Sequence, residues 1–405
     1  MRIALLKNKD LQAAFNDLGV SEARFVQASL PPAPQFSLSW LAGMGDVEIA
    51  RQLAVSLFDL VALPERSAIA ESQFRAAQWR AAELVLRLAT NVRRQYYITV
   101  AAAGHAAFLG EAVASAQASA ELARQLGEAG SLNKLELARE DAFYSELAAQ
   151  LADARVAQKA ERERLIRLMG LWGRDIDIRL PRNLPPLPRR IATLADVEAK
   201  ALRDRVDLKV ARHDLDALAR LHGLTSATRF VTDFSLALQD DRESGPVPTQ
   251  GALGANTLMR RGLAADFTIP IYDFGEARVR GAEEAYMAAA NRLAQRAIGV
   301  RSQAREAYLR AHGKYEVARI YEQRVLPLRK TILDQDLLQY NGMLTDVTQL
   351  IADARARIIS NINAINARRD FFLALADLDA ALLGGGAVDN AAEATPGTSA
   401  ATIPD

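Results

Sequence analysis

The sequence predicts a mainly α-helical protein with a small β part and an internal twofold repeat. Three observations predict this class: long segments rich in Ala, Leu, Glu, Arg and Gln, short segments in which apolar and polar residues alternate, and a motif that recurs in the second half of the chain. The 405 residues carry 50 Lys and Arg against 49 Asp and Glu, and no cysteine. This composition argues against a nucleic-acid partner and excludes disulfides, thiolate metal sites and a cysteine nucleophile.

The repeat begins with a short predicted helix. Residues 10–18 and 207–215 share Asp, Leu, Ala, Asp and Leu in the same register. In each half a strand of alternating residues follows, at 36–40 and at 234–238. A second strand is then predicted in each half, ending at residues 57–60 and 271–274.

A long helical hairpin follows the strands of the first half. Residues 67–126 contain no proline and favour uninterrupted helix, which at 1.5 Å per residue would be about 90 Å long. Gly127 and Gly130 then break the pattern, and helix is predicted again from 133 to 171. We expect the glycines to form a turn that needs a positive φ.

The second half repeats this hairpin. Helix is predicted over residues 276–339 and again over 346–383, with a break at Asn341 and Gly342. Pro327 lies inside the first of these segments and predicts a kink.

The resulting organisation has four parts. Residues 1–172 form the first repeat and 196–383 the second, each with a short helix, a β-hairpin and a long helical hairpin. A proline-rich linker at 173–195 joins them, and a tail of small residues at 384–405 is predicted to be disordered.

The predicted strands have one apolar and one polar face over about ten residues, which is the length and period of strands in transmembrane barrels. We expect the first loop, 42–48, to be much shorter than the second, 240–261. Four strands cannot close a barrel, so a membrane role requires oligomers, and three chains would supply twelve strands. The predicted lipid-facing residues are Phe230, Phe234, Leu236, Phe267 and Ile269.

A small sheet packed on the helices would also explain the alternation, and a soluble coiled coil would explain the alanine and charge of the helices. The leading alternative to transport is therefore a soluble coiled-coil scaffold that binds partner helices. No stretch is expected to be a transmembrane helix, and no secretion signal is recognised at the N-terminus.

The residues resemble the TolC-like outer membrane efflux proteins of Gram-negative bacteria over roughly residues 4–383. The resemblance rests on the repeat, on the strand-to-helix signature at 270–275 and on the second hairpin at 337–355. It implies a homotrimer with a twelve-stranded barrel in outer membrane lipid and a twelve-helix tunnel in the periplasm. The implied partners are a periplasmic adaptor and an inner-membrane pump, and the implied cargo is small toxic compounds, metal ions or proteins. Because such proteins begin with a secretion signal, we expect the given chain to start late.

The resemblance also implies roles at the helical tips, where these pores narrow. Glu136, Tyr340 and Asp346 are the predicted constriction residues, although Thr348 stands where an acidic residue is expected. The turns at Gly127, Gly130, Asn341 and Gly342 are the predicted adaptor contacts.

Catalysis is not expected. The sequence has no glycine-rich phosphate loop, no nucleophile elbow and no clustered histidines, and it predicts no cofactor and no metal site. The leading hypothesis is a passive export duct.

Overall fold

The computed structural model describes residues 1–43, 46–129, 133–189, 194–249, 252–342 and 347–384. They form two compact units. The helical unit contains Met1–Ala14, Ala82–Val206 and the described residues from Ala297 on, and the sheet unit contains Phe15–Ala81 and Asp207–Arg296. Tail residues 385–405 and Gly130 and Asp346 lie outside the described residues.

The order of elements repeats along the chain. The first half contains α1 (Arg2–Lys7), α2 (Lys9–Ser29), β1 (Gln35–Gly43), β2 (Asp46–Ser56), α3 (Leu57–Glu128) and α4 (Lys134–Leu168). After a 3₁₀ turn, η1 (Gly173–Ile176), the second half contains α5 (Leu194–Asp204), α6 (Val206–Ala227), β3 (Asp233–Thr249), β4 (Ala252–Thr268), α7 (Glu276–Ile320), η2 (Tyr321–Val325), α8 (Leu326–Asn341) and α9 (Val347–Leu383). The prediction of a mainly helical chain with a small β part is confirmed.

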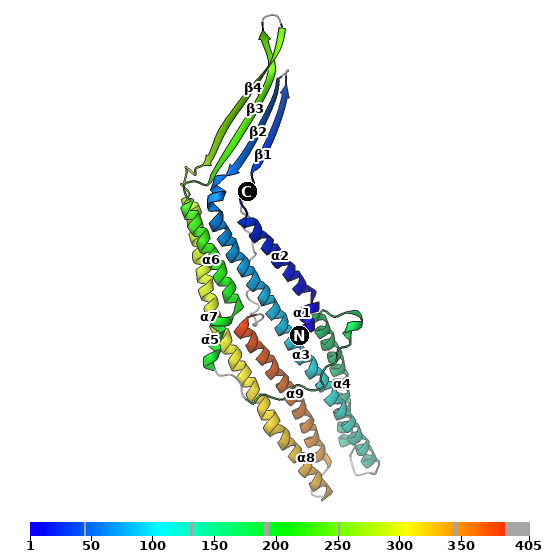
Figure 1. The fold of residues 1–405 in the computed structure, drawn as a ribbon. Helices are drawn as coiled ribbons and strands as arrows, with labels where there is room; N and C mark the ends of the chain where they lie inside the picture. The colour runs from blue at the N-terminus through cyan, green and yellow to red at the C-terminus, as the bar shows by residue number, and fades with distance from the viewer. Residues whose placement is uncertain (44–45, 130–132, 190–193, 250–251, 343–346, 385–405) are drawn as a thin grey trace. The chain divides into compact units, whose positions relative to one another are not determined.

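The sheet unit is built on one antiparallel sheet with the strand order β1-β2-β3-β4 (Figure 1). Each predicted hairpin is present, and β2 pairs with β3 to join them, with Val55 opposite Leu236. The sheet therefore combines strands from both repeats.

The expected long loop at 240–261 is wrong, because β3 and β4 stay paired to Thr249 and Ala252. Pro246 and Pro248 favour a loop, although this part of the chain continues as β3. Pairing between β2 and β3 ends at Ser244, so beyond it β3 has β4 as its one partner among the described strands. Proline is tolerated on such an edge.

The predicted ends of the second strands are also wrong. Strand β2 ends at Ser56, whose side-chain oxygen accepts a hydrogen bond from the Asp59 N–H at 3.1 Å and so starts α3 at Leu57. Helix α3 therefore begins ten residues earlier than predicted and includes Pro64. Strand β4 ends at Thr268, before a turn described below.

The long helix of the second half is interrupted near Pro327, as predicted. Residues Tyr321–Val325 form a π-helical turn, and Pro327 stands in the first turn of α8, where its missing N–H costs least. A π-turn of this kind widens the helix locally and changes which side chains face inward.

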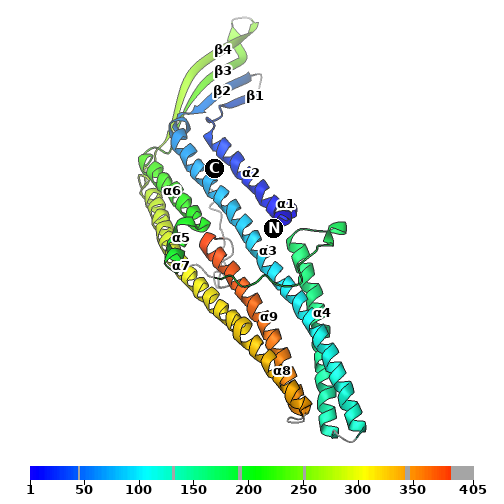
Figure 2. The same cartoon turned by 60° about the horizontal axis from the view of Figure 1, so that its bottom comes forward.

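The core of the helical unit lies where α3, α7 and α9 meet the linker. Val100, Phe371 and Leu184 are buried together, the last from the extended linker. The Tyr315 hydroxyl donates to the Pro188 carbonyl at 2.9 Å, which fixes the linker to α7. A second cluster joins Leu109 of α3 and Leu147 of α4, with Ile358 of α9 packed against it. The α3–α4 and α8–α9 pairs form two helical hairpins (Figure 2).

Candidate functional site

The first hairpin tip is held by a capping box. Helix α4 starts at Lys134, and the Asn133 side chain accepts from the Glu136 N–H at 2.9 Å while the Glu136 carboxylate accepts from the Asn133 N–H at 3.2 Å. Glu136, predicted at the constriction, thus has a local structural role. Its role in a pore stays a prediction.

The predicted positive φ is wrong for Gly127 and Gly342, and Gly130 lies outside the described residues. Gly127 lies inside α3, with no positive φ, and a Cβ added there would reach Leu137 Cδ2 at an ordinary 3.9 Å. Gly342 follows α8 with φ −83°. Positions 127 and 342 are therefore open to other residues on backbone grounds. Tyr340 is half-buried in the last turn of α8, and Asn341 is the last residue of that helix.

An ion pair near these tips joins the two hairpins. Arg355 of α9 donates from Nη2 to Glu140 Oε1 of α4 at 2.7 Å and to the Arg139 carbonyl at 3.1 Å. Its guanidinium also lies 4.2 Å from the centre of the Phe143 ring. The Glu140 side chain is only 8% exposed. Burial raises the pKa of this carboxyl, although Arg355 opposes the shift.

A pair of carboxyl groups lies within the second hairpin. Asp336 of α8 and Asp353 of α9 face each other, and the pKa of Asp336 is raised by burial first and then by a hydrogen bond and like charge from Asp353. Asp353 also accepts from Gln349 Nε2 at 2.6 Å and lies 3.8 Å from Arg329 Nη1. The two carboxyl groups can share a proton.

Sequence reasoning placed acidic residues at the tips but missed Glu140, Asp336 and Asp353. In the sequence these residues differ from other charged residues only in lying on the helix face that packs against a neighbouring helix. That face cannot be recognised in the alanine-rich helices, because their apolar periodicity is weak.

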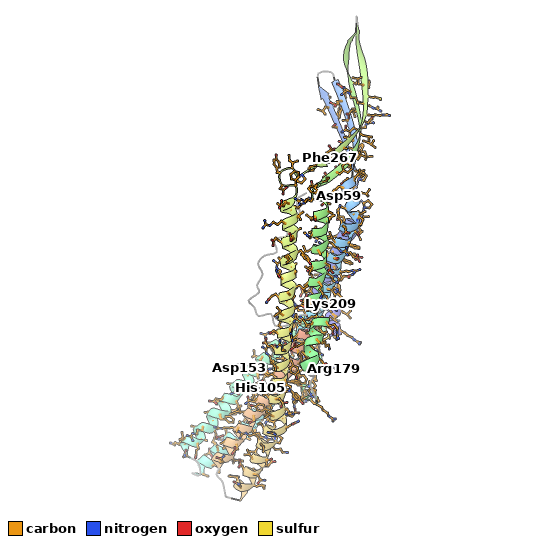
Figure 3. All side chains as sticks on the ribbon, turned by 90° about the vertical axis from the view of Figure 1, so that its left-hand side faces the viewer. Asp59, His105, Asp153, Arg179, Lys209 and Phe267 are labelled. Carbon is orange, nitrogen blue, oxygen red and sulfur yellow. The ribbon has the colours of Figure 1, made fainter. Side chains whose placement is uncertain are left out.

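The sheet has one apolar and one polar face, as predicted. Register places Phe36, Leu53, Leu238 and Leu263 in one row across all four strands, and Phe234 opposite Phe267 in another. Phe36 is 68% exposed and Leu263 71%. Phe267 lies at the end of β4 nearest to α7 (Figure 3). The apolar residues of this face include Phe36, Leu38, Trp40, Ile49, Leu53, Val55, Phe234, Leu236, Leu238, Met259, Leu263, Ala265 and Phe267.

The opposite face of the same strands is mostly small and polar, with Leu41 and Leu258 as large apolar exceptions. Ser37, Gln52, Gln239 and Gly262 form one of its rows, and Ala237 is fully buried among its neighbours. Two of the predicted lipid-facing residues, Phe230 and Ile269, lie just outside the strands and are exposed. The other three, Phe234, Leu236 and Phe267, lie on the apolar face.

The signature at 270–275 forms the turn from β4 into α7. Asp273 accepts from the Gly275 N–H at 3.0 Å and from the Ala277 N–H at 3.3 Å, and these bonds lower its pKa. Gly275 has φ +73°, and a Cβ there would lie 2.4 Å from the Arg229 carbonyl oxygen. The Arg229 Nε in turn donates to the Phe274 carbonyl at 2.9 Å. This signature is thus a helix cap with an obligatory glycine.

Within the described ranges, no three His, Asp or Glu side chains gather closely enough to hold a metal ion. A cavity of about 370 Å³ in the helical unit lies beneath the linker, with Glu111, Arg182 and Arg368 on its rim. The Arg368 guanidinium is engaged with Glu322 at 2.8 Å.

The sequence predicts no transmembrane helix, but among the described residues α3 is long and apolar enough to cross a membrane by length and composition alone. Alanine contributes to this apolar character without adding bulk. Val100 and Leu109 of α3 pack against other helices of the unit.

No family model and no curated protein matches the sequence, but solved structures match the fold. The outer-membrane channel OprN has a TM-score of 0.78 at 18% identity over 95% of this chain and 89% of its own. The chain has the TolC-like fold. The outer membrane protein VceC of Vibrio cholerae has a TM-score of 0.74 at 17% identity, with 95% of both chains covered. The MtrE outer membrane channel of Neisseria gonorrhoeae, in its open state, has a TM-score of 0.76 at 18% identity, with 95% of this chain and 88% of its own covered.

The TolC-like fold explains why the sequence alternates between strands and very long helices. Each repeat supplies one β-hairpin and one helical hairpin, and coverage near 95% means that both repeats take part in the match. At 17–18% identity these matches establish the fold.

Proposed function

We propose that this protein is the outer membrane channel of a tripartite efflux or secretion system. It would act as a passive duct that carries small toxic compounds or metal ions across the periplasm and the outer membrane. The observation that carries this proposal is the apolar face of the sheet. Phe36, Trp40, Leu263 and Phe267 are each more than three-fifths exposed on it, which costs free energy in water and none in lipid.

The strand order supports a homotrimer. Strands β1 and β4 are the edges of the sheet, and open edges are not tolerated in lipid. Pairing β1 of one copy with β4 of the next would close the sheet, and three copies would give twelve strands. With the polar face turned inward, Gln52 and Gln239 would line a water-filled lumen.

The helical hairpins would then extend into the periplasm and end in a trimeric tunnel. Their tips, at Gly127 and at Asn341 and Gly342, would contact a periplasmic adaptor, with Tyr340 and Glu136 near the constriction. The transport energy would come from an inner-membrane pump. The fold shared with OprN and MtrE supports these roles.

The test uses two neighbouring residues on opposite faces of β3. A lysine on the lipid side costs about 2–4 kcal/mol at the bilayer midplane. We expect Leu236→Lys to abolish insertion of the full chain into liposomes and formation of a cross-linked trimer, while Ser235→Lys inserts normally. A soluble monomer or dimer that tolerates both lysines would refute the proposal and favour a soluble scaffold.

A further inference from the structure

Charges are sorted between the two faces of the sheet at the level of Leu38 and Trp40. On the apolar face, Arg51, Asp240 and Arg261 lie in one row, and Arg242 lies in the next. On the polar face at the same level stand Asp241 opposite Arg260, and Glu48 opposite Glu243. At this level the apolar face thus carries three arginines against one acid, and the polar face three acids against one arginine. If both faces were simply exposed to water, each would be expected to carry charges of both signs.

The three arginines of the apolar face share a single carboxylate. Arg261 Nε donates to Asp240 Oδ1 at 3.1 Å, Arg242 Nε lies 3.8 Å from Oδ2, and Arg51 Nη1 lies 4.0 Å from Oδ2. One carboxylate neutralises one guanidinium, so this cluster keeps a positive excess. The Arg242 Nε is shielded from solvent without a hydrogen-bond partner. We call Arg51, Arg242 and Arg261 the arginine cluster.

The position of the cluster along the strands indicates what it meets. Six residues separate Phe234 from Asp240, about 20 Å along the strand. Leu38 shares the row of Arg51 and Arg261, and Trp40, Ile49 and Met259 share the row of Arg242. The cluster therefore lies where charged residues first interrupt the apolar face, away from the strand ends that lead into the helices. Trp40 shares the row of Arg242 and is 72% exposed. Tryptophan beside arginine at the edge of an apolar band is typical of the headgroup level of a membrane.

We propose that the arginine cluster binds the phosphate groups of lipid headgroups in the outer leaflet. Guanidinium groups form bidentate, charge-assisted hydrogen bonds with phosphate, and an unsatisfied positive excess next to lipid needs such an anion. This inference rests on the proposed function, because it requires the apolar face to lie in the membrane. It adds a headgroup site that fixes the depth of the barrel.

Neighbouring residues on opposite faces provide matched variants. Arg261→Gln removes a charge from the cluster, and Arg260→Gln removes the same charge from the polar face one residue away. Asp240→Asn removes the carboxylate that the arginine cluster shares, and Asp241→Asn is its counterpart on the polar face. Arg261→Gln and Asp240→Asn should change binding in opposite directions, whereas their counterparts on the polar face should leave it nearly unchanged.

The experiment measures binding of lipid A, a glucosamine lipid with two phosphates, to the full-length trimer in detergent by native mass spectrometry. We expect Arg261→Gln and Arg242→Gln each to weaken binding about fivefold, and Asp240→Asn to tighten it. Arg260→Gln and Asp241→Asn should stay within twofold of wild type. Enzymatically dephosphorylated lipid should bind to wild type as weakly as lipid A binds to Arg261→Gln.

Two outcomes would overturn the headgroup site. Equal binding of the dephosphorylated lipid, or equal effects of Arg260→Gln and Arg261→Gln, would show that the cluster does not recognise phosphate. Liposome insertion of the wild type is measured in parallel. If the wild type inserts as a trimer and the variants do not differ, the headgroup site is wrong and the channel proposal stands. If the wild type does not insert, both fail.

Discussion

Arg355 and Glu140 join the two helical hairpins through a hydrogen-bonded ion pair of 2.7 Å. The pair connects α9 to α4, and the two residues are 215 positions apart in the sequence. Glu140 is the more buried partner, and its pKa is raised by that burial. Arg355 therefore compensates a carboxylate that would otherwise be costly to bury.

Removing Arg355 should destabilise the helical unit more than removing an exposed arginine. We expect Arg355→Ala to lower the free energy of unfolding by about 3 kcal/mol at pH 8, because it leaves the Glu140 carboxylate buried and unpaired. Arg310→Ala, which breaks an exposed pair with Glu306 on α7, should cost less than about 0.5 kcal/mol. Urea denaturation in detergent measures both values.

The cost of Arg355→Ala should also depend on pH. The raised pKa of Glu140 means that its protonated form is favoured in the folded protein, and without Arg355 this preference grows. As the pH falls through that raised pKa, Glu140 becomes neutral and the penalty shrinks. A loss of stability that is the same at pH 8 and pH 5 would contradict this account.

Asp336→Asn should stabilise the second hairpin. The pKa of Asp336 is raised, so the folded state favours its protonated form, and this contribution is present at low pH and lost as the pH rises through the raised pKa. An amide keeps a donor for Asp353 at every pH. We therefore expect a higher melting temperature than wild type at pH 8 and a difference that narrows toward pH 4. Asp334→Asn, on the exposed side of α8, is the control and should leave the melting temperature unchanged at both pH values.

These contacts mark the limit of what the sequence could predict. Strand alternation identified Phe234, Leu236 and Phe267 because a period of two is visible in a short segment. Glu140 and Arg355 are invisible by the same method, since the α4 helix shows little apolar periodicity and the partners come from different repeats. Charged residues occur on all faces of these helices, so the sequence does not distinguish the buried charged residues from the exposed ones.

The hairpin between β3 and β4 shows a second limit. Glycines and prolines between Gly245 and Gly254 predict a loop, yet β3 and β4 stay paired up to Thr249 and Ala252. The deciding fact is that this part of β3 lacks β2 as a neighbour, which depends on the length of β2 and not on local sequence. The turn at 270–275 was recognised as a signature, but its cap and the close approach of the Arg229 carbonyl to Gly275 required coordinates.

Gly275→Ala should damage the turn into α7. A side chain at φ +73° costs about 1–2 kcal/mol, and its Cβ would also lie 2.4 Å from the Arg229 carbonyl oxygen. We expect a lower melting temperature and a reduced yield of folded protein. Gly281→Ala is the matched control inside α7, where nothing lies within 4 Å, and it should stabilise by about 0.5–1 kcal/mol. A Gly275→Ala variant that melts at or above the wild-type temperature would show that the turn does not require glycine.

The cap residue of the same turn should give a pH dependence of the opposite sign to that of Asp336. The Gly275 and Ala277 N–H groups lower the pKa of Asp273, so the ionised form is favoured in the folded protein. Its contribution is therefore present above the unfolded pKa of about 4 and is lost as the pH falls through the lowered folded pKa.

Asp273→Ala should have a lower melting temperature than wild type at pH 7, and the gap should close as the pH approaches 3. Asp273→Asn keeps an acceptor for the Gly275 N–H without the charge, so it should melt between the two at pH 7 and vary little with pH. A gap between Asp273→Ala and wild type that is constant from pH 7 to pH 3 would mean that the carboxylate charge contributes nothing to the cap.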